Sequence, residues 1–226
     1  MSHFKHLSIV IPVGPDDNAW LSLLAELKSA GIESEIILSA CQPQVASLEL
    51  PADIIWINGQ QGRAQQLNAG AEKSSGAVIW FLHADSRLTA GVSQTLQDYL
   101  QSAKQTLGYF KLKFAADGPQ TMRLNAWAAN IRSRYFGLPF GDQGFMLPKA
   151  IFQALKGFDV TLPMGEDLDF VIRAQAAKIA LQAFDTELIT SARCYQQQGW
   201  LQTTVRYVYL TLCLNYQAKR RLLGAS

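Results

Sequence analysis

The chain has 226 residues, of which 49% are hydrophobic and 17% are charged, and its formal net charge is +2. This composition excludes a disordered chain, and the longest apolar run, Ala77–Leu82, is far shorter than the roughly 20 residues of a membrane-spanning helix. We therefore expect a folded protein with a large core and no signal peptide.

The charge is divided unevenly along the chain. The first 187 residues carry 15 basic and 18 acidic side chains, whereas no acid follows Glu187. The basic residues after that point are Arg193, Arg206, Lys219, Arg220 and Arg221. Such a tail favours contact with an anion, such as a phosphate or a membrane surface, and a solvated helix end is an equally good alternative.

Two further properties narrow the class of protein. The three cysteines, Cys41, Cys194 and Cys213, are far apart and lack metal-ligand spacing, which favours reduced thiols in a cytoplasmic protein. No basic stripe runs through the body of the chain, so we expect no nucleic-acid partner.

The N-terminal half predicts strands that alternate with helices. The predicted strands are Leu7–Val13, Glu35–Ser39, Asp53–Ile57 and Ala77–Leu82, each apolar almost throughout. Helical spacing appears from Trp20 to Leu27 and between Arg63 and Lys73. Because continuous apolar strands between helices are typical of a parallel sheet covered on both faces, we expect an α/β fold whose ligands bind beyond the carboxyl ends of the strands.

The second half predicts fewer strands. We expect a helix near Thr89–Ser102, a strand near Tyr109–Phe114, a helix with Trp127 and Ile131, a loop at Gly137–Gly144 and a helix at Glu166–Ala177. The last segment, Leu201–Leu223, has apolar residues at spacings of three and four, as in an amphipathic helix. These residues are Val205, Val208, Tyr209, Leu212 and Tyr216.

Acidic side chains at two predicted element ends are candidates for chemistry. Asp85 follows the strongest strand and is able to hold a divalent cation that bridges a diphosphate, or simply to cap the next helix. Glu166 and Asp167 begin a predicted helix, where a carboxylate is able to accept a proton from a hydroxyl nucleophile or to serve the helix dipole. Asp169 is placed to pair with Arg173 four residues later.

Polar residues beside glycines form a second set of candidates. Arg63 follows Gly62 at a predicted strand-to-helix turn, which suits a phosphate or a carboxylate. Asp142 and Gln143, between Gly141 and Gly144, are candidates for sugar hydroxyls, although such residues also occur in ordinary turns. The chain has neither a P-loop nor a serine nucleophile elbow.

Four segments, taken in order, resemble a known family. They read LSIVIPV, GRAQQLNAGAEKSSGAVIWFLHADS, GDQGFMLPKAIFQALKGFD and PMGEDLDFVIR. The chain resembles the inverting, nucleotide-sugar-dependent glycosyltransferases of family 2, which have the GT-A fold. The segments GRAQQLN, FLHADS, GDQG and TSAR look closest to a small bacterial subgroup associated with radical-SAM and selenium-related domains. The resemblance runs roughly from Leu7 to Arg206.

The resemblance implies a GT-A fold with a mixed, mainly parallel sheet flanked by helices and a C-terminal helix. It implies one domain over residues 1–226, with a nucleotide-binding half at 1–105, an acceptor-side half at 106–200 and an amphipathic helix at 201–226. The implied partners are a nucleotide-sugar donor and an unknown acceptor, with Mn²⁺ or Mg²⁺ as cofactor.

Residue by residue, the resemblance assigns roles to the same positions. Asp85 matches the last carboxylate of the D-x-D motif and is the metal ligand, and Asp167 matches the general base, supported by Glu166. The implied donor- or nucleotide-binding residues are Pro12, Val13, Arg63, Asn68, His83, Ala84 and Asp85. The implied donor-sugar or acceptor loop is Asp142, Gln143 and Gly144, and Arg193 and Arg206 are the expected diphosphate contacts.

Three departures from the family pattern keep other functions open. His83 stands for the first acid of the D-x-D motif, Ser39-Ala40-Cys41 follows the second strand where the family has a base-recognising aspartate, and Arg193-Cys194 stands for an arginine pair. One alternative is a nucleotidyltransferase, although the loop after the first strand has no basic residue. Another is a GT-A-fold binding protein that has lost donor recognition.

The C-terminal helix also has two interpretations. The one we favour is that its apolar face packs on the catalytic domain and that Arg206 faces the diphosphate. The alternative is a peripheral contact with the inner face of the membrane, with Lys219–Arg221 at the headgroups. The apolar residues of that alternative are Tyr207, Tyr209, Leu210 and Leu214.

Overall fold

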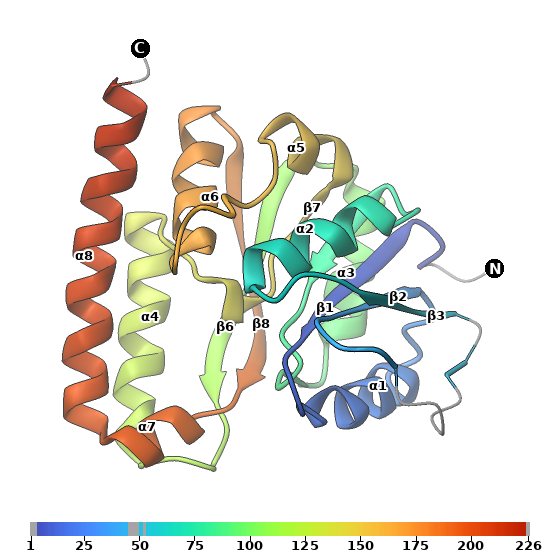
Figure 1. The fold of residues 1–226 in the computed structure, drawn as a ribbon, viewed down its shortest axis with the longest axis horizontal. Coiled ribbons are helices and arrows are strands. Elements are labelled where there is room, and N and C mark those ends of the chain that lie inside the picture. The colour runs from blue at the N-terminus through green and yellow to red at the C-terminus, as the bar shows by residue number, and fades with distance from the viewer. Residues whose placement is uncertain (1–3, 45–49, 52, 225–226) are drawn as a thin grey trace.

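The structure is a computed structural model that describes residues 4–44, 50–51 and 53–224. The side chain of Lys219, one member of the basic tail, lies outside that description. The described part forms one eight-stranded sheet with helices on both faces, and the long C-terminal helix stands at the edge farthest from the N-terminus (Figure 1).

The N-terminal half alternates strands and helices, as predicted. Its elements are β1 (Leu7–Val13), α1 (Ala19–Ser29), β2 (Glu35–Ala40), β3 (Ile54–Asn58), α2 (Arg63–Lys73), β4 (Val78–Phe81), β5 (Arg87–Leu88) and α3 (Val92–Ser102). The predicted strands are confirmed to within one or two residues. The helix predicted near Thr89–Ser102 begins three residues later because Gly91, with φ +92°, precedes its first turn.

The second half contains more elements than the sequence predicted. They are β6 (Thr106–Phe114), α4 (Met122–Phe136), the 3-10 turn η1 (Gly141–Gln143), β7 (Met146–Pro148), α5 (Lys149–Ala154), α6 (Glu166–Ala176), β8 (Ala180–Thr190), α7 (Arg193–Gln198) and α8 (Trp200–Gly224). The sequence analysis missed β5, β7, β8, α5 and α7. The longest of these is β8, whose polar residues interrupt the apolar runs that mark the other strands.

The sheet has the strand order β3-β2-β1-β4-β7-β6-β8-β5. Strands β1 to β4 are parallel to one another, and β6 is parallel to β8. Strand β7 is antiparallel to its neighbours β4 and β6, and β5 is antiparallel to β8. The expected mixed, mainly parallel sheet is therefore confirmed. Because β1 and β4 are parallel neighbours, the loops after Val13 and Phe81 meet at the same edge.

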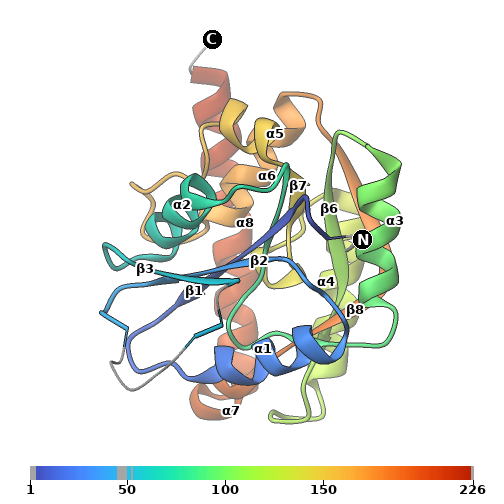
Figure 2. The ribbon, with the colours of Figure 1, turned by 90° about the vertical axis from the view of Figure 1, so that its right-hand side faces the viewer.

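Alternating side chains of the strands supply two cores. On β1, Leu7, Ile9, Ile11 and Val13 belong to the core beneath α1 and α3, whereas Val10 belongs to the core beneath α2, α5 and α6. Figure 2 shows α1 and α3 separated from α2 and α6 by the strands. Gly70 of α2 allows a close approach to β1, since a Cβ there would lie 2.3 Å from Cγ1 of Val10.

Helix α8 lies against the second half of the molecule. It runs beside α4 (Figure 1), and a small cluster of Leu168 and Ile172 from α6 with Leu214 and Ala218 attaches it to the body. Among the described residues, no helix has both the length and the apolar character needed to cross a lipid bilayer.

Candidate functional site

A pocket opens where the carboxyl ends of β1 and β4 meet the start of α2. Its volume is about 300 Å³. It is lined by Pro12, Gly14, Asp17, Arg63, Gln66, His83, Ala84 and Asp85. The parallel sheet therefore presents this group of polar side chains at the edge where such sheets bind ligands.

Arg63, the first residue of α2, is the centre of the charged contacts. Its Nε lies 3.1 Å from Oε1 of Glu166, at the start of α6, and its Nη2 contacts Nε2 of His83. Burial, and then the charge of Arg63, hold the pKa of His83 well below its usual value, so the imidazole is neutral near pH 7. Burial raises the pKa of the Glu166 carboxyl, and Arg63 opposes this.

Gly141 brings these groups together with the second acidic motif. A Cβ at this position would lie 2.5 Å from Nη2 of Arg63, 3.3 Å from Nε2 of His83 and 3.4 Å from Oδ2 of Asp167. The backbone N–H of Gly141 donates to Oδ2 of Asp167 at 2.8 Å. A side chain at position 141 would displace the guanidinium of Arg63 and crowd His83 and Asp167, so glycine allows these three groups to approach one backbone position.

Asp167 is held by backbone donors from two sides. Besides the bond from Gly141, its Oδ1 accepts the N–H of Leu168 at 2.7 Å. Gly165, with φ +80°, turns the chain into α6 and so places Glu166 and Asp167 at the helix start, where backbone N–H groups favour negative charge. The carboxylate is oriented toward η1 as a result.

Asp142 is the most perturbed carboxyl of the site. Its Oδ1 is buried and, within the described part of the chain, has no hydrogen-bond partner. Burial raises the pKa of Asp142 to about 6, an effect that Arg132 opposes and Asp167 reinforces. A buried, unpartnered carboxyl oxygen beside a second carboxylate is a group that readily exchanges a proton near neutral pH.

Arg132 of α4 is the cation that lowers the pKa of Asp142 most strongly. Its guanidinium stacks over the Phe140 ring, 3.4 Å from the centroid, and burial lowers its pKa while Asp142 and Asp167 raise it. Arg132 was not predicted as a site residue, because it belongs to no recognisable sequence motif. Its inward direction on α4, between exposed apolar residues, becomes visible only in the structure.

Asp85 also lines the first pocket. Burial raises the pKa of its carboxyl, the charge of Arg193 lowers it, and Asp17 raises it. Within the described residues, no group of three His, Cys, Asp or Glu side chains is placed to hold a metal ion. A divalent cation would therefore share Asp85 with ligand oxygens, which is how Mg²⁺ commonly binds beside phosphates.

Two predicted site residues have structural roles instead. Asn68 donates to the carbonyl of Phe158 at 2.8 Å and accepts from its N–H at 2.9 Å, so it holds the loop after α5 rather than reaching the pocket. Gln143 is fully buried: its Nε2 donates to the carbonyl of Phe110, and its Oε1 accepts from Ser133 and from the N–H of Phe140. It fixes the shape of η1.

The other predicted residues are divided between the pocket and its surroundings. Pro12, His83 and Ala84 line the pocket, whereas Val13 is buried behind it. Gly144, with φ +65°, ends η1 against Trp80 and Phe110. Arg193 is close enough to influence Asp85, but Arg206 lies on an exposed edge of α8 and is not among the residues that line the pocket.

Gln66 is a pocket residue that the sequence analysis did not single out. Its Nε2 donates to the carbonyls of Val13 and Ser39, both at 2.7 Å, and so ties the carboxyl ends of β1 and β2 together. Its position three residues after Arg63, on the buried face of α2, was the only available signal.

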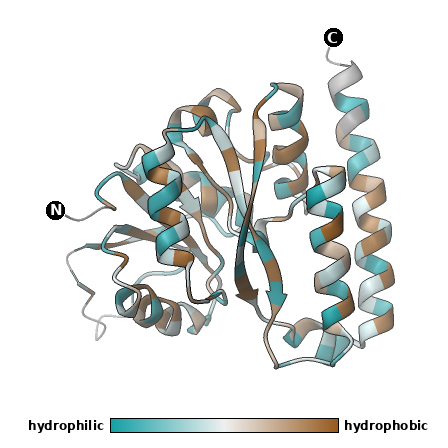
Figure 3. Cartoon of the chain, turned by 180° about the vertical axis from the view of Figure 1, so that it is seen from behind, coloured by the Kyte–Doolittle hydropathy of each residue, from teal (hydrophilic) through white to brown (hydrophobic). Residues whose placement is uncertain are grey.

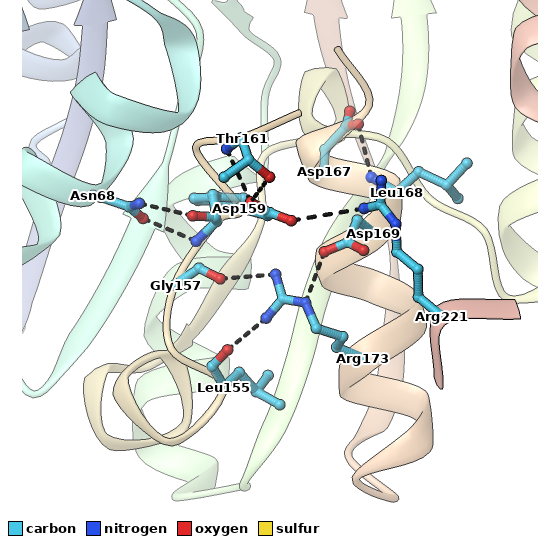
Figure 4. A network of polar contacts seen from close by, with 11 residues as sticks. Asn68, Leu155, Gly157, Asp159, Thr161, Asp167, Leu168, Asp169, Arg173 and Arg221 are labelled. Atoms are coloured by element: carbon cyan, nitrogen blue, oxygen red, sulfur yellow. Dashed lines mark hydrogen bonds and ion pairs between the residues drawn. The ribbon is translucent and has the colours of Figure 1, made fainter. Parts of the chain in front are cut away.

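The loop that leads into α6 is held by a network of its own (Figure 4). Arg173 pairs with Asp169 at 2.7 Å, as predicted, and also donates to the carbonyls of Leu155 and Gly157. Asp159 accepts from the N–H and hydroxyl of Thr161 at 2.9 and 2.7 Å. These bonds fix the path of the chain toward Glu166 and Asp167.

Comparison with known proteins gives a fold but no family. No protein-family model and no curated protein sequence matches the chain. Among solved structures, that of S. aureus TarS 1-349 in complex with UDP-GlcNAc is similar at a TM-score of 0.61 and 15% identity, covering 84% of this chain and 59% of that one. The structure of S. aureus TarS is similar at 0.59 and 14%, covering 83% and 37%.

The chain thus spans less than two thirds of the length of either TarS structure, and at this identity the likeness shows a shared fold. The GT-A fold expected from the four motifs is confirmed. The likeness to the radical-SAM-associated subgroup finds no support in these comparisons and stays a prediction.

Proposed function

We propose that this chain is a glycosyltransferase that moves a sugar from a nucleotide-diphospho-sugar to an acceptor hydroxyl with inversion. The observation that carries this proposal is the convergence at Gly141 of Arg63, His83 and Asp167, beside a pocket at the carboxyl ends of β1 and β4. TarS, a glycosyltransferase with the same fold, supports it through its complex with UDP-GlcNAc. Membership of family 2, and of its bacterial, cytoplasmic subgroup, is part of the proposal and rests on the sequence motifs.

The first pocket is the proposed donor site. A nucleoside diphosphate leaving group carries negative charge, and two cations are at hand: Arg63 lines the pocket, and Arg193 is close enough to influence Asp85. Asp85 is the residue that would hold Mg²⁺ or Mn²⁺, whose charge would offset that of the departing diphosphate. The neutral His83 replaces an acid at this place, so Arg63 rather than a second carboxylate neighbours the phosphates.

The acceptor-side carboxylates are the proposed base. In an inverting transfer, the acceptor oxygen bonds to the anomeric carbon, the bond to the diphosphate breaks, and a carboxylate takes the hydroxyl proton. The sequence motif assigns this role to Asp167, whose position is fixed by Gly141 and Leu168. Asp142 is a second candidate, favoured by its unpartnered oxygen and its pKa of about 6.

Calorimetric titration with UDP-, GDP- and dTDP-sugars, each with and without Mn²⁺, tests the donor site. We expect one of these donors to bind, and to bind more weakly after addition of a chelator or in Asp85→Asn. A folded protein that binds none of them would contradict the proposal. Because Asp85 is a single carboxylate, chelation should weaken donor binding rather than abolish it.

Two other functions, a binding protein without transfer activity and a nucleotidyltransferase, can each be tested by a separate assay. A GT-A-fold binding protein is favoured by Ser39-Ala40-Cys41, the last two residues of β2 and the residue after it, which offer no acid to a nucleobase. Slow, metal-dependent release of nucleoside diphosphate from the bound donor would eliminate it. A nucleotidyltransferase would instead release pyrophosphate from a nucleoside triphosphate and a sugar phosphate, although the loop from Gly14 to Asp17 carries no basic residue to hold a triphosphate.

A further inference from the structure

Helices α4 and α8 expose large apolar side chains along their length. On α4, Leu124, Trp127 and Tyr135 are 60–75% exposed. On α8 the side chains that are 56–67% exposed are Leu201, Val205, Val208, Tyr209, Leu212 and Tyr216. The stripe expected to pack on the catalytic domain therefore faces outward, and a different face, with Leu214 and Ala218, contacts α6.

The two exposed stripes form one surface. Asn125 of α4 donates to Oγ1 of Thr204 and accepts from Nε1 of Trp200, both at 2.9 Å, so the first turns of the helices face each other. The later part of α8 packs beside Leu138 and Phe140, which follow α4, and the helices therefore run in the same direction. At about 100° per residue, the exposed apolar residues of α8 centre about a quarter-turn from this contact. On α4, Leu124 and Tyr135 lie about a quarter-turn from it, and Trp127 lies nearer the far edge. On both helices these residues are on the side opposite the buried residues. We call this surface the α4–α8 face, and Figure 3 shows its two helices side by side, coloured by hydropathy.

Arginines border the α4–α8 face on both long edges. Counted from Asn125, Arg123 and Arg134 lie within roughly 20° of the edge of α4 that points away from α8. Nη1 of Arg134 also lies 3.5 Å from Oδ1 of the exposed Asp185 of β8, so Arg123 is the stronger candidate for a headgroup contact on this edge. Counted from Thr204, Arg206 and Arg220 lie within roughly 20° of the edge of α8 that points away from α4. Neither helix contains an acidic residue.

We propose that the α4–α8 face binds the surface of an anionic lipid bilayer, with both helices lying in the plane of the interface. Apolar residues in the middle would enter the acyl boundary, and arginines at the edges would reach the phosphate headgroups. The stripe is rich in the aromatic types that prefer this depth, with Trp127, Tyr135, Tyr209 and Tyr216. Such a large exposed apolar surface marks an interaction site.

The charge of the face favours a bilayer over a second copy of the chain. A symmetric pair would bring the same surface of two molecules together, and the arginine edges would find no acidic residue on the facing helices. Lipid phosphates supply the missing anions. The proposal corrects the earlier membrane alternative, because Leu214 packs inward on α6 and Leu210 is half-buried.

Cosedimentation with phosphatidylcholine vesicles, with and without phosphatidylglycerol, tests the proposal on the full chain. We expect binding to the anionic vesicles that weakens at high salt. The double variant Trp127→Ser/Leu212→Ser should weaken binding about tenfold or more, since it removes apolar groups from the acyl boundary. Arg123→Gln/Arg206→Gln should weaken it by a similar factor at low salt only.

Matched controls keep the result specific. Leu21→Ser changes an exposed apolar residue on α1, and Lys28→Gln/Lys104→Gln removes two exposed cations away from the face. Circular dichroism checks that each variant is folded, and the controls should bind like the parent chain. The proposal is overturned if the parent chain stays in the supernatant with anionic vesicles or if the face variants bind as well as the controls. It is equally overturned if sedimentation velocity shows a dimer that Trp127→Ser/Leu212→Ser converts to monomer.

Discussion

The two halves of the molecule handle charge in different ways. In the N-terminal half, the polar residues at the strand ends line an open pocket, and Arg63 is 40% exposed at its side chain. In the second half, the carboxylates of the site are partly or wholly covered, and Asp142 keeps a buried oxygen without a partner in the described structure. The N-terminal half therefore offers its polar groups to solvent, whereas the second half holds a buried carboxyl with a raised pKa.

The largest effect should come from the covered carboxylates. Asp167→Asn keeps the shape of the side chain but removes its basicity, so transfer should slow by about 10²–10⁴ if Asp167 takes the proton. Asp142→Asn should then cost far less. Initial rates at saturating donor, with donor affinity measured separately, distinguish the two. Loss of activity in Asp142→Asn with Asp167→Asn unaffected would move the base to Asp142.

Arg63→Ala should weaken donor binding by about ten- to a hundredfold, because it removes a charge-assisted contact to phosphate and leaves Glu166 without its partner. Calorimetric titration of the donor provides the measurement. Arg87→Ala is the matched control, since Arg87 pairs with Glu26 on the other side of the sheet. Equal affinities for the two variants would exclude Arg63 from the donor site.

The raised pKa of Asp142 should also make the free energy of unfolding depend on pH. The pKa of Asp142 rises from 3.8 to about 6 on folding, so the folded state holds this proton more tightly than the unfolded state. The stabilisation is present at low pH and is lost as the pH rises through about 6. Asp142→Asn should therefore raise the free energy of unfolding at pH 7 by about 1–3 kcal/mol and remove this part of its pH dependence. Urea unfolding at pH 5 and pH 7 measures both, and unchanged stability at pH 7 would contradict the prediction.

Asn68→Ala should have the smallest effect on donor binding although Asn68 shares α2 with Arg63. It removes two hydrogen bonds to Phe158, at a cost of about 1–2 kcal/mol in the free energy of unfolding. Thermal unfolding and donor titration of the same sample check this. A loss of affinity as large as that of Arg63→Ala would restore Asn68 to the nucleotide site.

The sequence predicted elements better than contacts. Leu7–Val13 and Ala77–Leu82 were recognisable as strands because they are buried on both faces, whereas β8 was missed because Asp185 and Glu187 interrupt its apolar pattern. Asp85, Asp142 and Asp167 became candidates through their places at predicted element ends, and their roles stay predictions. Asn68 holds a loop through Phe158, a residue 90 positions away in the chain. Hydrophobic periodicity does not indicate contacts between residues so far apart in sequence.

The central role of Gly141 was equally hidden. The glycines at 141 and 144 marked a loop, but the reason for the first is the approach of Arg63, from α2, and Asp167, from α6. Only the folded chain brings those side chains to one backbone atom. The same holds for the outward-facing stripe of α8, since spacing identifies an apolar face without saying what covers it.

The place of β8 in the sheet sets the order in which the protein can assemble. Strands β1, β2 and β3 follow one another closely in the chain, and β2 pairs with both of the others. Strand β8, the last to be synthesised, instead lies between β6 and β5. Partners so distant in sequence close late and slowly. A nascent chain can therefore form the β1–β3 part of its sheet early, whereas one edge of β6 stays unpaired until residue 190 has left the ribosome. The chain is most exposed to aggregation during that interval.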